Sequence, residues 1–188
     1  MLDVYSQCPT EENARYLLRM IRPEDCEDLL KVYSDEKAVP LFNGDNCHGD
    51  DFHYTTMERM REAIGFWQFS YEQRYFVRWS IMDKVRSEVI GTIELFHRVA
   101  EDYFTDCGLL RLDLRSDVET AEAIREILSL ILEPAYDWFA CSMIATKAIP
   151  QAEERVAALK QLGFEHVQQK LIGHDKAEYG DYFVRMKQ

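Results

Sequence analysis

The sequence predicts one mixed α/β (α+β) domain whose twisted sheet is mostly antiparallel and is flanked by helices. Three strand patterns, at 75–82, 88–98 and 104–114, follow one another with short connections, and such connections join antiparallel neighbours. Helical patterns stand before and after this run. The 188 residues contain no repeat, linker or low-complexity tract, so residues 1–188 are expected to form a single domain.

The segment before these strands is predicted to form one strand and two helices. Residues 14–21 (ARYLLRMI) are rich in apolar side chains and are expected to form a strand. A helix should follow, because Pro23 stands near its first position and the apolar residues of 26–33 form an i, i+3, i+4, i+7 stripe. After a polar loop at 43–53, residues 55–71 carry the pattern of a second, amphipathic helix.

The segment after the three strands carries the strongest helical periodicity, at 118–139. Pro134 is expected to end or kink that helix, because proline removes a helical hydrogen bond. Gly163 is well placed as the residue that follows the last helix. The other predicted elements are a short buried strand at 142–149, a helix at 151–162, and a final hairpin of strands at 164–172 and 179–186. The predicted order is β-α-α-β-β-β-α-β-α-β-β.

The composition excludes some classes of function. The net charge of −12 argues against binding to a nucleic-acid backbone, and it suits a cationic substrate such as a polyamine, an aminoglycoside or a Lys-bearing peptide. Plain solubility is the more ordinary cause of such a charge. The acidic cluster at 43–53, which includes Cys47 and His48, fits no calcium-loop or zinc spacing, so no metal is expected.

The same composition indicates a cytoplasmic protein. No apolar run approaches the ~20 residues that cross a bilayer, and the first residues lack the basic start of a signal peptide. The five cysteines are scattered and odd in number, which favours a reducing compartment. Cys107 and Cys141 are expected to be small buried side chains. We therefore expect no membrane and no nucleic-acid partner, and a homodimer is left open.

Three segments together resemble the GNAT (Gcn5-related N-acetyltransferase) superfamily, above all its ribosomal-protein and small-molecule acetyltransferases. They are IRPEDCEDLLKVYSDEKAV after the first strand, VIGTIELFHR at 89–98 and VAALKQLGFEHV at 156–167. The resemblance covers roughly residues 15–187. It implies a V-shaped splay between the strands at 104–114 and 142–149, and acetyl-CoA as co-substrate.

The resemblance also implies a pyrophosphate loop of the form [QR]-x-x-G-x-[GA] at the start of the 118–139 helix. Arg115 matches its first position, whereas Val118 and Thr120 stand where glycines should be. A β-branched residue resists the positive φ that glycine allows. Ala152 and Arg155 replace an Asn and a Ser that many relatives carry. The cofactor contacts implied by the resemblance fall on Leu112, Leu114, Arg115, Val118, Glu119, Thr120 and Ala121.

Acetyl transfer to an amine needs a base for the amine and an acid for the leaving thiolate. Relatives often place an acidic residue on the third or fourth strand, which points to Glu94 and Asp106 as candidate bases. Burial in an apolar strand is expected to raise the pKa of Glu94. Tyr179 and Tyr182 are the candidate general acids, with aromatic packing as the alternative for each.

The predicted function is an acyl-CoA-dependent N-acetyltransferase that moves an acetyl group from acetyl-CoA to a primary amine by direct attack. The amine belongs to a small molecule, a protein N-terminus or a lysine. Because the loop at 115–121 lacks glycine, a catalytically degenerate GNAT-fold module that binds a ligand or regulates a partner is the alternative.

Overall fold

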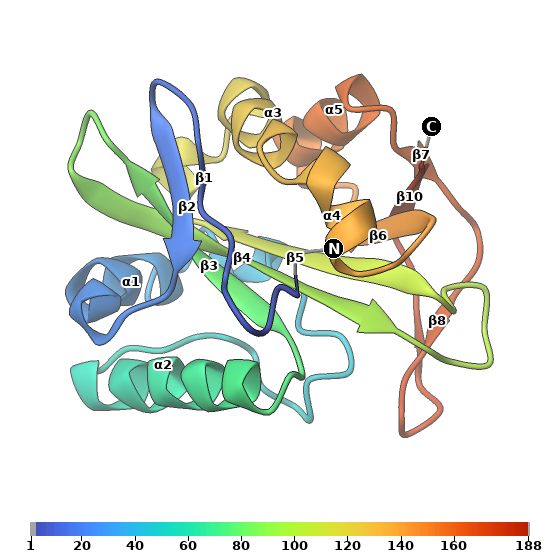
Figure 1. Ribbon diagram of the computed structural model, residues 1–188, viewed down its shortest axis with the longest axis horizontal. Helices are drawn as coiled ribbons and strands as arrows, with labels where there is room; N and C mark the ends of the chain where they lie inside the picture. The colour runs from blue at the N-terminus through green and yellow to red at the C-terminus, as the bar shows by residue number, and fades with distance from the viewer. Residues whose placement is uncertain (1–2, 188) are drawn as a thin grey trace.

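The computed structural model describes residues 3–187 and contains an eight-stranded sheet in the order β1-β2-β3-β4-β5-β6-β10-β7 (Figure 1). Its strands are β1 (Glu11–Glu12), β2 (Tyr16–Met20), β3 (Val77–Asp83), β4 (Glu88–Arg98), β5 (Cys107–Leu114), β6 (Met143–Lys147), β7 (Glu165–His166) and β10 (Tyr182–Met186). All neighbours pair antiparallel except β5 and β6. The predicted largely antiparallel sheet is therefore confirmed.

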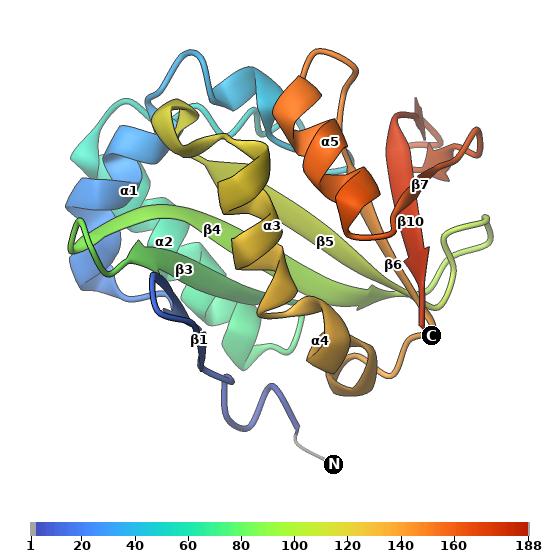
Figure 2. The same ribbon diagram turned by 90° about the horizontal axis from the view of Figure 1, so that it is seen from above.

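Helices cover both faces of the sheet (Figures 1 and 2). One face carries α1 (Cys26–Tyr33) and α2 (Met57–Glu72), and the other carries α3 (Ala121–Ser129), α4 (Leu132–Trp138) and α5 (Glu153–Gln161). Short 3₁₀ turns are η1 (Pro23–Asp25), η2 (Val39–Leu41) and η3 (Ser116–Val118). A separate two-stranded hairpin consists of β8 (Leu171–Ile172) and β9 (Glu178–Tyr179).

The alternation of side chains along β3 and β4 divides the core in two. Trp79 and Ile93 face α3 and α4, and they are fully buried in the larger apolar cluster. Their sequence neighbours Arg78 and Glu94 face the α2 side and are buried as well. A strand with a period of two therefore places a charged row inside the molecule on one face only.

The central sheet splays where β5 meets β6. The pairing runs from Cys107 opposite Met143 to Leu110 opposite Thr146. Beyond that pair, β5 continues to Leu114 beside β4, while β6 ends at Lys147. The splay that the resemblance implied is therefore present, and it opens at the carboxyl ends of β5 and β6.

The helix predicted at 118–139 is two helices. It breaks between α3 and α4, at Leu130 and Ile131, about one turn before Pro134. Pro134 then lies in the first turn of α4, where its missing N–H costs little. The amino end also differs, because η3 occupies 116–118 and Thr120 caps α3 by accepting a hydrogen bond from the amide of Ala123 (3.2 Å).

The other elements near the carboxyl end are shorter than predicted. The end of α5 at Gly163 is as predicted. The final hairpin is divided, since β7 pairs with β10 whereas β8 pairs with β9. Gly163 follows α5 with φ +82°, and the amide of Phe164 donates to Leu159, which closes the predicted helix end as a Schellman motif. Cys107 and Cys141 are buried, as predicted.

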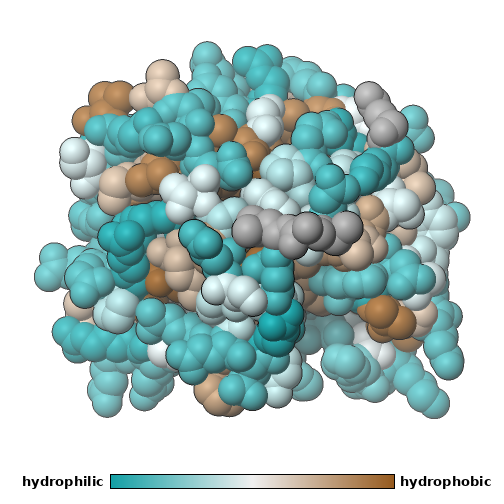
Figure 3. Space-filling model, in the orientation of Figure 1, coloured by the Kyte–Doolittle hydropathy of each residue, from teal (hydrophilic) through white to brown (hydrophobic). Residues whose placement is uncertain are grey.

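The surface is mostly polar. Hydrophilic side chains dominate the face drawn in Figure 3, and apolar side chains appear there as small separate patches. Within residues 3–187, no helix is long and apolar enough to cross a membrane.

Candidate active site

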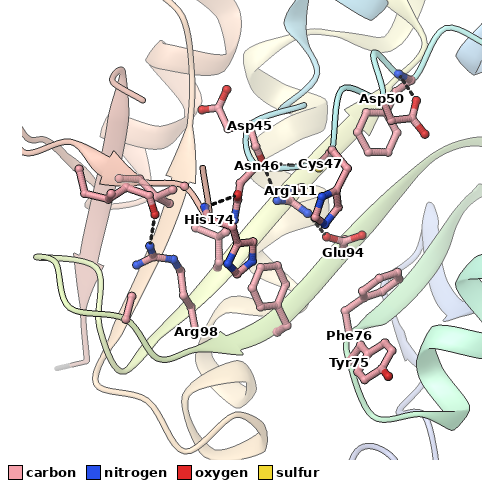
Figure 4. A pocket seen from close by; sticks show the side chains of 18 of the residues that line it. Asp45, Asn46, Cys47, Asp50, Tyr75, Phe76, Glu94, Arg98, Arg111 and His174 are labelled. Atoms are coloured by element: carbon pink, nitrogen blue, oxygen red, sulfur yellow. Dashed lines mark hydrogen bonds and ion pairs between the residues drawn. The ribbon is translucent and has the colours of Figure 1, made fainter. Parts of the chain in front are cut away.

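A cavity of about 1340 Å³ lies on the α2 side of the sheet. Its walls come from α2, β3, β4 and β5, the loop at 45–54 and the β8–β9 hairpin. Figure 4 shows Tyr75 and Phe76 on one side of it and His174 on the other. Aromatic side chains form much of the wall: Phe52, Tyr54, Phe66, Trp67, Tyr75, Phe76 and Phe96.

A buried ionic network forms the floor of this cavity. Glu94 binds Arg78 through one carboxylate oxygen and Arg111 through the other. Arg78 also donates to Asp113 (3.2 Å) and lies against the Trp67 ring, 4.1 Å from its centroid. All of these side chains except Trp67 stand on β3, β4 or β5, where alternation points them to the same face.

The structure corrects the expectation that the pKa of Glu94 is raised. Burial of Glu94 acts to raise its pKa, but the charges and hydrogen bonds of Arg78 and Arg111 outweigh it and lower the pKa below the usual value. Both carboxylate oxygens are occupied by guanidinium donors. Glu94 is thus a buried anion that holds two cations in place.

Asp106 does not line the cavity. It lies in the turn before β5 with φ +51°, and its side chain is 72% exposed. Its Oδ1 atom lies 3.4 Å from Nε2 of His97. His97 stands on β4, directly opposite Gly108 of β5. Because Gly108 still pairs with β6, this carboxylate stands at the closed end of the splay.

The two candidate tyrosines differ in position. The Tyr182 side chain is fully buried on β10, where its hydroxyl donates to Asp45 (3.1 Å) and accepts from Asn43 (3.3 Å). Burial is the main cause that raises the pKa of Tyr182 far above its usual value. Tyr179 lies on β9, half-buried, with the Lys147 ammonium 6.0 Å from its ring centroid.

Asp45 is the site residue that the sequence did not single out by itself. Its carboxylate binds Lys147 at 2.7 and 2.8 Å, and its carbonyl accepts from Arg111 (3.0 Å). Lys147 ends β6 and Arg111 stands on β5, so Asp45 spans the splay from the cavity side. The sequence showed only an acidic loop, because these partners lie 66 and 102 residues away.

On the opposite face, the loop at 115–121 makes its turn without glycine. No residue in that range has a positive φ, because the 3₁₀ turn η3 and a tight bond from the Thr120 amide to Val118 (2.8 Å) carry the bend. Asp117 does not cap α3. It pairs with Arg115 and Arg86, which lower its pKa to about 2.

Five amides of this loop already have acceptors. Ser116 donates to Asp35 (2.8 Å) and Ala121 donates to Glu154 (2.7 Å). The amides of Val118, Glu119 and Thr120 donate to carbonyls within the loop. In this arrangement none of these five amides is available to a phosphate oxygen.

Arg155 closes the cleft that the splay of β5 and β6 forms beside this loop. Its guanidinium binds both oxygens of Glu119 (2.7 and 2.9 Å) and donates to the carbonyls of Leu112 (2.8 Å) and Leu41 (3.0 Å). Leu112 stands two residues past the last β5–β6 pair. Arg155 is only 2% exposed, so the guanidinium fills the splay from the α5 side.

The GNAT acetyltransferase domain model matches residues 15–165. The chain belongs to the GNAT family of acetyltransferases. Solved structures of this fold resemble the chain at low identity. RimJ from Mycobacterium smegmatis, in complex with CoA-disulfide, has a TM-score of 0.65 and 12% identity over 90% of this chain and 79% of its own. No curated protein sequence matches the chain.

Two further GNAT structures cover the chain almost completely. The spermidine/spermine N-acetyltransferase SpeG from Vibrio cholerae has a TM-score of 0.62 and 11% identity over 93% of this chain and 95% of its own. A Bacillus anthracis GNAT acetyltransferase has a TM-score of 0.68 and 10% identity over 95% and 98%. This GNAT domain therefore shares its architecture with those enzymes, whereas its cleft, with five loop amides and the Leu112 carbonyl occupied, does not fit CoA as it stands.

Proposed function

We propose that this GNAT domain transfers an acetyl group from acetyl-CoA to a primary amine that enters the cavity beside α2. The single observation that carries the proposal is the position of this cavity, which reaches Glu94 and Arg111 on β4 and β5. These strands border the splay of the GNAT sheet. An acceptor in the cavity and a donor in the splay would approach each other from opposite faces.

The cavity walls favour an amine on a sizeable, partly apolar body. The volume of about 1340 Å³ exceeds the range of roughly 300–1000 Å³ that is usual for small-molecule sites. Tyr75 and Phe66 are exposed at its edge and offer aromatic faces. Aromatic faces also attract ammonium groups. A peptide or polyamine acceptor fits these features better than a minimal amine does.

We propose that Glu94 acts in this reaction as a positioning residue. Its carboxylate is held by Arg78 and Arg111 and its pKa is lowered, so it is a weak proton acceptor. Its place at the cavity floor fixes the two guanidiniums. The catalytic roles of Asp106, Tyr179 and Tyr182 stay predictions.

The test of the function is direct acetylation. The purified wild-type chain is incubated with acetyl-CoA and a panel of acceptors: a polyamine, an aminoglycoside, and peptides that present a lysine or a free N-terminus. Mass spectrometry of the acceptors then measures a mass increase of one acetyl group. We expect at least one acceptor to be modified. Absence of any modified acceptor would favour the alternative, a GNAT-fold binding or regulatory module. That alternative is supported by the occupied cleft.

The site itself is tested with two exposed tyrosines. Tyr75 lines the cavity and is 61% exposed, whereas Tyr103 is 44% exposed and lies outside it. Replacing Tyr75 by Ala should lower kcat/KM by about fivefold or more, because an aromatic contact with the acceptor is lost. Replacing Tyr103 by Ala is the matched control and should leave kcat/KM nearly unchanged. Equal effects of the two variants would place the acceptor elsewhere.

A further inference from the structure

The acyl-donor cleft of this chain holds side chains of the chain itself. Glu154 and Arg155 are consecutive residues in the first turn of α5, and they point into the two halves of the cleft. Glu154 accepts a hydrogen bond at a helix amino end, as a pyrophosphate would. Arg155 binds a main-chain carbonyl of β5, as an extended amide chain would. This cleft is the donor site of the proposed function, and the inference about it rests on that function.

Glu154 occupies the amino end of α3. Its carboxylate accepts a hydrogen bond from the Ala121 amide at 2.7 Å, at the first residue of the helix. Helix amino ends carry free N–H groups and a positive partial charge, which attract phosphate as well as carboxylate. The Glu154 carboxylate thus stands where an anionic ligand of this loop would bind.

Arg155 occupies the open edge of β5. Its Nη1 donates to the Leu112 carbonyl at 2.8 Å, past the point where β6 leaves the sheet. An exposed strand edge binds an extended ligand through such main-chain groups. The guanidinium is fixed there by the two oxygens of Glu119, and the side chains of both residues are largely shielded from solvent.

We propose that Glu154 and Arg155 form an internal plug, which occupies the acyl-CoA cleft in the free protein and is displaced when CoA binds. Glu154 is exposed and makes one bond to the loop, so it is the part that a ligand displaces first. The plug makes CoA affinity depend on residues that do not touch CoA in the bound state.

The structure offers a matched control for this plug. Glu153 precedes Glu154 in the same turn of α5, is equally acidic and exposed, and makes no hydrogen bond or ion pair to the cleft among the described residues. Replacing Glu154 by Ala removes both a charge and the competing acceptor, whereas replacing Glu153 by Ala removes a charge alone. The difference between the two variants isolates the plug from general electrostatics.

The experiment is calorimetric titration of the wild type, Glu154→Ala and Glu153→Ala with CoA at fixed ionic strength. We expect CoA to bind Glu154→Ala about tenfold more tightly than the wild type, and Glu153→Ala within about threefold of it. Equal affinity of all three proteins would overturn the plug and leave the proposed function standing. No binding by any of them, at millimolar CoA, would overturn both.

A second measurement does not depend on affinity. Hydrogen exchange of the Ala121 amide reports whether Glu154 holds it. We expect protection in the free wild type, loss of protection in free Glu154→Ala, and recovery in that variant when CoA is added. Protection that is unchanged by the substitution would contradict the plug, whatever the binding constants.

Discussion

At the scale of single residues, an ion pair between Arg155 and Glu119 fills the splay between β5 and β6. The side chains of Arg155 and Glu119 are both largely shielded from solvent, and they face each other with bidentate geometry. Removing two charges from water is costly, and the attraction between them and the bonds to Leu112 and Leu41 offset that cost. The pair therefore matters more for which structure forms than for how stable it is.

Substitutions at the Arg155–Glu119 pair should have a non-additive effect on stability. Arg155→Met alone leaves Glu119 buried without a cation and should reduce the free energy of unfolding by about 3–5 kcal/mol. Adding Glu119→Leu should recover much of that loss, because the unpaired charge is removed. Urea unfolding of the wild type, both single variants and the double variant measures the coupling. Simple addition of the two single effects would show that the pair is not coupled.

The residue scale also shows what the sequence could and could not predict of the site. Arg155, Val118 and Thr120 were visible as departures from the GNAT pattern, because a motif makes a replaced residue conspicuous. The role of Asp45 was not visible, since its partners are distant in the chain. The wrong expectation for the Glu94 pKa arose because strand alternation does not reveal which two cations lie across the sheet.

At the scale of elements, the strands and helices at the middle of the chain were the most predictable. The hairpin of β3 and β4 and the helix α2 follow from period and spacing, and they lie within a few residues of the expected bounds. The ends were not predictable in the same way. The break between α3 and α4 and the division of the last hairpin depend on tertiary contacts that no local pattern contains.

A close approach between two elements lies at Gly91, where β4 passes β5. A Cβ on Gly91 would lie 2.1 Å from the Asp113 carbonyl oxygen, which is backbone and cannot move aside freely. Gly91→Ala should therefore reduce the free energy of unfolding by about 3 kcal/mol. Gly65→Ala is the control, because Gly65 lies within α2 with nothing within 4 Å of its added Cβ, and it should stabilise the helix by about 0.5–1 kcal/mol. Similar urea midpoints for the two variants would refute the steric argument.

At the scale of the whole molecule, the chain that carries a site proposed for amines has a large net negative charge. The formal net charge is −12. Charge of one sign raises the local concentration of oppositely charged ligands, and salt screens this effect. The charge therefore bears on the rate at which a cationic acceptor reaches the cavity, whereas the contacts inside the cavity determine how it is held.

The last prediction follows from this field. The kcat/KM for a polyamine acceptor should fall about tenfold between roughly 10 and 150 mM salt, because the Debye length shortens from about 30 to 8 Å. The kcat/KM for an acceptor with a single amine should fall less, since the attraction scales with ligand charge. Steady-state acetylation of both acceptors over a salt series, with kcat as the internal reference, measures the difference. Parallel salt curves for the two acceptors would show that the acidity of the chain serves its solubility and does not attract the substrate.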